Sequence, residues 1–331
     1  MKTPLLSICI ATFNRAEYIG ETLESIIPQV TDDVEIVIVD GASTDNTSSI
    51  VRHYIEVCKQ IHYIQLPSKG GVDQDFCKAV EYAKGEYCWL FTDDDLLKAG
   101  AIEQVLFEIS KGYSLIIVNS EVWNQDFTTL IFEKHLSDKA QTVYEPHEFE
   151  VFFQHCVSYL SFIGAVVIKK NIWKERDKDS YFGTGFVHIG VIFQKLLPTT
   201  IRVITKPYIK IRYGNAQWSS RKFEIWMIQW PMLLWSFDVI SQTSKQNIIA
   251  REPWRNLKEL FVYRSLSAYN IKVLQKLISN YTISYLWLFF AKCISLFPVK
   301  LAKRILIKYY AIRGKAKDLT YYDLLEEFNN K

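Results

Sequence analysis

Residues 85–100, Gly-Glu-Tyr-Cys-Trp-Leu-Phe-Thr-Asp-Asp-Asp-Leu-Leu-Lys-Ala-Gly, join an apolar run to an acidic cluster. The run from Tyr87 to Phe91 is typical of a strand that is buried on both faces. Asp93, Asp94 and Asp95 follow it, and adjacent carboxylates repel one another unless a cation or strong hydrogen-bond donors lie between them. Oxygen ligands at a strand end suit Mg²⁺ or Mn²⁺ carrying phosphate oxygens. A solvated turn before a helix N-terminus would favour the same acids.

Apolar runs and helical segments alternate over roughly the first 120 residues. We expect a polar loop and a helix after each of the first strands. This alternation predicts right-handed crossovers and a Rossmann-like, mostly parallel α/β sheet flanked by helices. The expected strands are 5–12, 34–39, 61–66, 87–91 and 115–119, and the expected helices are 17–27, a segment ending near 59, 75–84 and 100–110.

Polar clusters follow the expected strands where ligands of such sheets bind, at the carboxyl ends. Neither Gly-x-Gly-x-x-Gly nor Gly-x-x-x-x-Gly-Lys-Ser/Thr follows the first strand, so dinucleotide-binding and P-loop interpretations are poor. The clusters are Thr12, Asn14 and Arg15; Asp40 and Asp45; Gly70, Gly71 and Asp73; and Asp93, Asp94 and Asp95.

Charge is unevenly distributed along the 331 residues, although the net charge is only +3. Residues 1–100 hold 8 Lys/Arg against 16 Asp/Glu, and the remainder holds 31 against 20. The acidic part argues against a nucleic-acid partner and suits a metal, while the basic part suits an anionic membrane or a phosphorylated substrate. The six cysteines form no Cys-x-x-Cys pair and the N-terminus lacks a signal-peptide apolar segment, so a cytoplasmic protein with reduced thiols is expected.

These motifs carry a family resemblance. Residues 5–120 resemble the nucleotide-sugar-binding half of a family 2 glycosyltransferase with the GT-A fold, on the segments 7–15, 38–45, 85–87 and 92–95. The segments 70–75, 85–89 and 183–188 are more similar to abequosyltransferase-like enzymes of O-antigen synthesis. The resemblance implies transfer of a sugar, such as the dideoxyhexose abequose, from a CDP- or UDP-sugar. The implied acceptor is a lipid-linked oligosaccharide, and the implied metal is Mg²⁺ or Mn²⁺.

The resemblance also implies roles for individual residues. Thr12, Asn14 and Arg15 would line the base and ribose pocket together with Gly71 and Asp73, and Asp40 would accept a hydrogen bond from the base. Asp93 would lie near the ribose or the metal. Asp94 and Asp95 would bind the metal, and Asp95 is a candidate catalytic residue. Many relatives have Asp-x-Asp-Asp where this chain has Thr92-Asp-Asp-Asp, which leaves the metal ligands open.

His188 is the second candidate catalytic residue. Inverting family members take a proton from the acceptor with a carboxylate, and the corresponding segment, 183–190, has no carboxylate. His188 would be that base or a third metal ligand, or a core histidine bonded to a backbone carbonyl. Asp179 is a weaker candidate base, and a retaining route stays open. The loop around 206–222, with Arg212, Asn215, Trp218 and Arg221, would close over the diphosphate or form an ordinary surface.

The C-terminal region is expected to be helical. The expected domains are a GT-A domain at 1–222, divided near 120 into nucleotide-sugar and acceptor halves, and a helical region at 223–331. The apolar segment 281–297 is shorter than the roughly 20 residues that span a bilayer. Residues 300–313 suit a helix lying on the cytoplasmic face of the inner membrane, or one packed on the domain. Their apolar side is Leu301, Ile305, Tyr309 and Ile312, opposite Lys300, Lys303, Arg304 and Lys308.

Two other functions compete with glycosyl transfer. A sugar nucleotidyltransferase has a similar sheet, but usually carries a Gly-rich basic loop after the first strand, where this chain has Thr12-Phe-Asn-Arg15. A non-catalytic sugar-binding protein would explain the missing acidic pair. Metal-dependent hydrolysis of a nucleotide sugar would argue against a non-catalytic sugar-binding protein.

Overall fold

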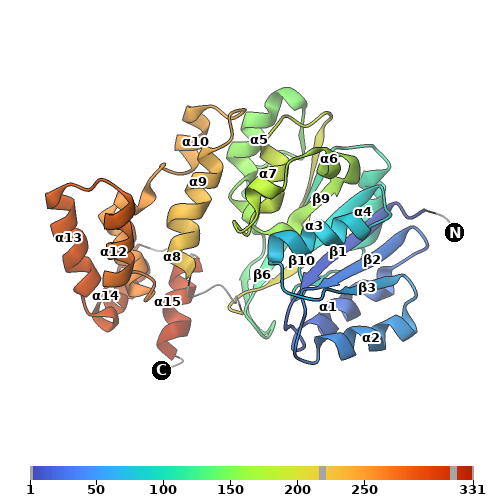
Figure 1. Cartoon of the computed structure of the whole chain (residues 1–331), viewed down its shortest axis with the longest axis horizontal. Helices are drawn as coiled ribbons and strands as arrows, with labels where there is room; N and C mark the ends of the chain where they lie inside the picture. Colours follow the sequence, from blue (N-terminus) through green and yellow to red (C-terminus); the bar gives the residue numbers. More distant parts are fainter. Residues whose placement is uncertain (1–2, 216–220, 314–318, 330–331) are drawn as a thin grey trace. The chain divides into compact units, whose positions relative to one another are not determined.

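The computed structural model describes residues 3–215, 221–313 and 319–329, and the chain forms two compact units (Figure 1). The first unit comprises Met1–Tyr213 and Phe237–Ser244, and the second comprises Gly214–Ser236 and Lys245–Lys331. The boundary expected at residue 222 therefore lies inside the second unit. Trp218 of the expected loop lies outside the described residues.

The first unit contains a mixed sheet with the order β3-β2-β1-β4-β9-β6-β10-β5. Its parallel pairs are β1 with β2 and β4, β2 with β3, and β6 with β10, whereas β9 lies antiparallel between β4 and β6. The strands are β1 Leu6–Thr12, β2 Val34–Asp40, β3 Ile61–Gln65, β4 Tyr87–Phe91, β5 Leu96–Leu97, β6 Leu115–Trp123, β7 Leu130–Phe132, β8 Val143–Tyr144, β9 Val166–Lys169 and β10 Ile201–Arg212.

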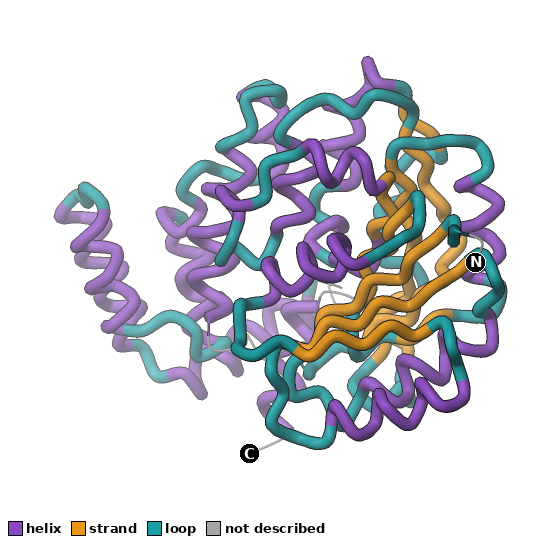
Figure 2. The backbone as a smooth tube through the Cα atoms, turned by 45° about the vertical axis from the view of Figure 1, so that its right-hand side comes forward, coloured by secondary structure: helices purple, strands orange, loops and turns teal. Residues whose placement is uncertain are grey.

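Helices lie on both faces of this sheet, which explains why its central strands are apolar throughout (Figure 2). Every side chain of β4 is fully buried, as the apolar run predicted. The Rossmann-like α/β fold is therefore confirmed. The helices of this unit include α1 Ile19–Ile26, α2 Thr47–Val57, α3 Val72–Tyr82, α4 Ala101–Ile109, α5 Phe149–Cys156, α6 Lys170–Glu175 and α7 Val187–Phe193.

The long strand β10 was missed in the sequence. The sequence predicted a loop around 206–222, but residues up to Arg212 continue β10, which pairs with β6. Pro207 interrupts the strand pattern, and the pairing register shifts on both sides of it. The strand returns to the sheet after this irregularity and ends at Arg212, beside the acidic cluster.

The second unit is helical and has a separate apolar core, which includes Phe223, Trp254 and Tyr269. Pro298 lies between two neighbouring helices, α13 (Tyr285–Leu296) and α14 (Val299–Ile312). Within the described ranges no single helix has the length and composition of a membrane span; α13 and α14 meet that test only together, and they are bent by 98°. The helices are α8 Lys222–Glu224, α9 Trp230–Trp235, α11 Leu257–Ser265, α12 Ile271–Asn280, α13 Tyr285–Leu296, α14 Val299–Ile312 and α15 Leu319–Asn329; α10 Gln242–Ile248 begins in the first unit.

Candidate active site

The acidic cluster is paired with an arginine from the first strand–helix loop. Nε of Arg15 lies 3.3 Å from Oδ1 of Asp93, and Nη2 lies 3.1 Å from Oδ2 of Asp94. The pKa of Asp93 is raised to about 7, because burial and, to a smaller extent, the Asp94 carboxylate outweigh the lowering by Arg15 and the Thr12 hydroxyl. The sheet therefore brings Thr12, Arg15 and both aspartates together, as their positions at strand ends predicted.

Asp95 has different surroundings from the other two aspartates. It is almost fully buried, its Oδ1 accepts a hydrogen bond from the backbone N–H of Arg212 at 2.7 Å, and its Oδ2 accepts one from the Thr92 hydroxyl. Burial raises the pKa of Asp95 well above its ordinary value. Each oxygen thus accepts one hydrogen bond within the protein, which gives Asp95 a structural role in the turn, and the metal and catalytic roles expected of it stay predictions. The pair that faces Arg15 is Asp93 and Asp94.

Arg212 holds the acidic turn in place and was not expected to do so. Its Nε donates to the backbone oxygen of Asp94 at 2.9 Å, and its Nη1 donates to the backbone oxygen of Gln125 at 2.7 Å. Its Nη2 forms an ion pair with the Glu21 carboxylate. A guanidinium with this many fixed partners acts as a positioning group. The expectation that Arg212 closes over a diphosphate is therefore corrected. Farther along the expected loop, exposed Arg221 pairs with Glu224 at 3.4 Å.

Asp40 ends β2 and organises the loop that follows. Its Oδ1 accepts a hydrogen bond from the Ser43 backbone N–H at 2.7 Å, and its Oδ2 accepts one from the Tyr63 hydroxyl at 2.5 Å. Asn14 joins the same loop through its Oδ1, which accepts a hydrogen bond from the Thr44 N–H at 2.8 Å, and it adopts φ 52°, a left-handed conformation that Asn tolerates. Asp40 and Asn14 therefore hold the loop after β2 in place through these hydrogen bonds.

Asp73 anchors the segment that carries the Gly-Thr-Gly motif. Its Oδ2 accepts a hydrogen bond from the Gly185 N–H at 2.9 Å, and its Oδ1 accepts one from the Val187 N–H at 3.0 Å. Asp73 is 4% exposed, so the direct role in nucleotide binding expected of it is corrected to a positioning role. Gly71 precedes it with φ 110°, which favours glycine at this helix start.

His188 is fully buried in α7. Its Nε2 lies 2.8 Å from the backbone oxygen of Leu160, and burial lowers its pKa to about 4. No group of three or more His, Cys, Asp or Glu side chains in the described part of the chain is arranged to hold a metal. The structure thus contradicts both the base and the metal-ligand role for His188. The third interpretation, a core histidine bonded to a carbonyl, agrees with these contacts.

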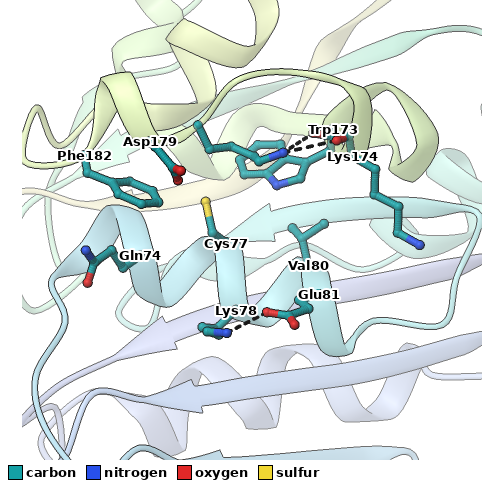
Figure 3. Close-up of a pocket in the computed structure, with 10 residues that line it drawn as sticks. Gln74, Cys77, Lys78, Val80, Glu81, Trp173, Lys174, Asp179 and Phe182 are labelled. Atoms are coloured by element: carbon teal, nitrogen blue, oxygen red, sulfur yellow. Dashed lines mark hydrogen bonds and ion pairs between the residues drawn. The ribbon is translucent and has the colours of Figure 1, made fainter.

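A cavity of about 460 Å³ lies beside α3, between that helix and the segment 173–182 (Figure 3). Cys77, Trp173 and Phe182 line it, with Asp179 at its exposed edge. Burial raises the pKa of the Cys77 thiol to about 12, so this thiol is not a nucleophile near neutral pH. The cavity shares no lining residue with the acidic cluster. Asp179, the weaker candidate base, therefore lines a cavity that is separate from the acidic cluster.

The Asp93–Asp94 pair fits a metal that takes its remaining ligands from phosphate. Mg²⁺ and similar ions are commonly held by one or two carboxylates together with substrate oxygens and water. Asp93 and Asp94 present neighbouring oxygens to the same guanidinium, which shows that a positive group is accommodated between them. These two residues are the ones that would hold the ion.

One buried carboxylate escaped attention in the sequence. Asp75 is 3% exposed, and its Oδ1 has no hydrogen-bond partner in the described structure. It stands two residues after Asp73 in the first turn of α3. An acid at this place looks like an ordinary helix-start residue, because acids are favoured there. Only the absence of a partner distinguishes it.

Comparisons with known proteins agree with this geometry. The model of the family described as Glycosyl transferase family 2 matches residues 7–164. Abequosyltransferase RfbV of Salmonella typhimurium is 26% identical over 276 residues, which cover 76% of this chain and 81% of that protein. Putative teichuronic acid biosynthesis glycosyltransferase TuaG of Bacillus subtilis is 30% identical over 128 residues, which cover 38% of this chain and 51% of that protein.

Two solved structures share the fold. Staphylococcus aureus TarS 1–349 in complex with UDP aligns with a TM-score of 0.58 at 18% identity, over 98% of this chain and 91% of that one. The mannosyltransferase PcManGT from Pyrobaculum calidifontis, in complex with GDP-Man and Mn²⁺, aligns with a TM-score of 0.55 at 16% identity, over 99% and 87%. At these identities the likeness concerns the fold alone.

Proposed function

The chain carries a glycosyl transferase family 2 domain and is a glycosyltransferase, and we propose that it moves a sugar from a CDP- or UDP-sugar to a lipid-linked oligosaccharide during synthesis of a surface polysaccharide. The observation that supports this most is the pair Asp93 and Asp94 at the end of β4, facing Arg15. The sugar would be a dideoxyhexose such as abequose, by analogy with the relative of that name.

The chemistry requires positive charge near the leaving group. Negative charge develops on the diphosphate as its bond to the sugar breaks, and a bound Mg²⁺ or Mn²⁺ would neutralise it. Asp93 and Asp94 would hold that ion, while Arg212 keeps the turn in shape through the Asp94 backbone. Arg15 supplies a fixed positive charge at the same place.

A donor screen tests this function. The full chain with Mn²⁺ is mixed with CDP-, UDP-, GDP- and dTDP-sugars, and both its thermal midpoint and the release of nucleoside diphosphate are followed. We expect one base to raise the midpoint, because a ligand that binds only the folded state stabilises it. Slow, metal-dependent release of the diphosphate is also expected. Release of pyrophosphate from a nucleoside triphosphate would instead favour the nucleotidyltransferase, and no release from any sugar would favour a binding protein.

The acceptor is proposed to be reached at an anionic membrane surface through α13 and α14. Tyr285 is 93% exposed and Ile312 is 86% exposed, and large apolar side chains between them are also exposed. We call these residues the apolar surface of α13 and α14: Tyr285, Leu286, Phe289, Phe290, Leu296, Leu301, Ile305, Tyr309 and Ile312.

The basic residues of this region indicate which partner would cover the apolar surface of α13 and α14. Between Glu259 and Asp318 the sequence has 11 Lys/Arg and no acid, which favours anionic lipid headgroups. A helix packed on its own domain would bury its apolar side. α14 does bury Ala302 and Leu306, together with Lys303, but its large apolar side chains Leu301, Ile305 and Tyr309 are exposed. This arrangement supports peripheral association of the enzyme with the cytoplasmic face of the inner membrane.

A further inference from the structure

Asp75 is a buried carboxylate with one oxygen that has no hydrogen-bond donor among the described residues. It is 3% exposed, and its Oδ1 makes no hydrogen bond in the described structure. A buried polar atom without a partner costs free energy comparable to a lost hydrogen bond or more. Such a group is commonly completed by something that the protein binds.

The position of Asp75 coincides with the carboxyl ends of the first strands. A Cβ atom at Gly41, which follows β2, would lie 2.7 Å from Oδ2 of Asp75 and 3.7 Å from the backbone oxygen of Thr12, which ends β1. A Cβ atom at Gly70, in the turn after β3, would lie 3.3 Å from Oδ1. Glycines at both places let the two loops close around the carboxylate. Ligands of open α/β sheets bind at this edge.

Charged and aromatic side chains lie around the loop that follows β3. Nζ of Lys69 lies 3.6 Å from the centre of the half-buried Phe13 ring, so a cation covers one face of this ring. The pKa of Asp75 is raised to about 6, because burial, with a smaller contribution from nearby Asp40, outweighs the lowering by Lys69. Both oxygens of Asp40 already accept protein hydrogen bonds. Oδ1 of Asp75, by contrast, accepts no hydrogen bond from the described residues and keeps its full acceptor capacity.

We propose that Asp75 accepts a hydrogen bond from the exocyclic amine of the donor's base, and that it thereby selects cytosine over uracil. This inference rests on the proposed function. Cytosine carries an amino group at C4, whereas uracil carries an acceptor oxygen there, which would face a carboxylate without a proton to share. A site that hydrogen-bonds one group discriminates strongly against an analogue that lacks it.

Calorimetric titration with CDP and with UDP, both with Mn²⁺, tests the proposal. The wild-type chain is expected to bind CDP at least about tenfold more tightly than UDP. In Asp75→Asn the amide can donate to the uracil oxygen, so the ratio is expected to fall to about one or to reverse. Asp138→Asn, at an exposed position, is the matched control and should keep the wild-type ratio.

The ligand can be changed instead of the protein, which covers the case in which Asp75→Asn does not fold. N4,N4-dimethyl-CDP lacks the amine hydrogens, and the wild-type chain should bind it no better than UDP. Equal affinity of the wild-type chain for CDP and UDP would overturn the inference, as would equal losses of both in Asp75→Asn. If CDP, UDP, GDP and ADP all fail to bind, the proposed function fails. If at least one of these nucleotides binds, but Asp75→Asn leaves the ratio of CDP to UDP affinity unchanged, only the inference about Asp75 fails.

Discussion

Nη2 of Arg15 lies 3.1 Å from Oδ2 of Asp94, so the acidic cluster carries its own positive partner. The same guanidinium contacts Asp93 through Nε at 3.3 Å. A divalent ion that binds these carboxylates must compete with Arg15 for them. The ion pair is partly buried, and because Arg15 contacts both carboxylates, loss of the Asp94 charge alone still leaves the guanidinium paired with Asp93.

Arg15→Ala should therefore increase the affinity for Mn²⁺ in the absence of nucleotide. We expect an increase of about tenfold, since a nearby opposite charge typically shifts the free energy of such a group by a kcal/mol or more. Titration of free Mn²⁺ by paramagnetic resonance measures this. Arg52→Ala, which removes an arginine on the outer part of α2, is the control. Unchanged Mn²⁺ affinity in Arg15→Ala would show that the pair does not compete with a metal.

Asp73→Ala should destabilise the first unit. The substitution removes the acceptor of the N–H groups of Gly185 and Val187, and Val187 is fully buried. A buried donor without an acceptor costs about 1–3 kcal/mol. Urea unfolding measures the change, with Asp179→Ala at an exposed position as the control. Equal stability of both variants would mean that Asp73 does not anchor the 183–187 segment.

The surroundings of His188 predict a pH dependence of stability. Its folded pKa, about 4, is below the ordinary 6.5, so the unfolded chain binds more protons between these values. Stability is therefore expected to fall as pH drops from 6.5 towards 4, by up to about 3 kcal/mol from this residue. His188→Gln should flatten that part of the profile in urea unfolding at each pH.

The same variant distinguishes a structural from a catalytic histidine. We expect His188→Gln to keep sugar transfer at neutral pH and its pH–rate profile, since the side chain is enclosed in the core. Loss of transfer with unaltered stability and nucleotide binding would restore the base role.

The apolar surface of α13 and α14 predicts binding to anionic vesicles. Leu286→Ser with Phe289→Ser should reduce co-sedimentation with phosphatidylglycerol vesicles by about tenfold or more, given about 25 cal/mol per Å² of apolar area. Phe107→Ser is the control, because Phe107 is 58% exposed on α4 of the first unit. Binding to neutral phosphatidylcholine should be weak in all chains. A loss in the control as large as in the double variant would refute this surface.

Strands that are buried at every position were predicted from the sequence, whereas strands with an irregular pattern were not. Tyr87–Phe91 was predicted with its observed bounds, because a strand buried on both faces is apolar at every position. The insertion of β9 between β4 and β6 depends on long-range pairing that no local pattern encodes. Pro207 concealed β10 by breaking its alternation.

The candidate site was predicted as a location more accurately than as a set of roles. Strand ends brought Arg15, Asp93 and Asp94 together, as sheet geometry requires. The role of Asp95 could not be inferred, because its partner Arg212 lies far away in the sequence. The sequence left His188 open between a base, a metal ligand and a core histidine, because the Leu160 carbonyl that it contacts lies far away along the chain.

We propose that Asp93 and Asp94 bind a divalent ion carrying the donor's diphosphate. Calorimetric titration of CDP and UDP, with Mn²⁺ and with EDTA, tests it in the wild-type chain, Asp94→Asn and the exposed control Asp138→Asn. We predict that Mn²⁺ strengthens binding by at least about tenfold in wild type and control, and that Asp94→Asn loses this gain while its thermal midpoint stays close to that of the wild type. Equal binding of the nucleotides in Mn²⁺ and in EDTA by all three chains would contradict metal binding by Asp93 and Asp94.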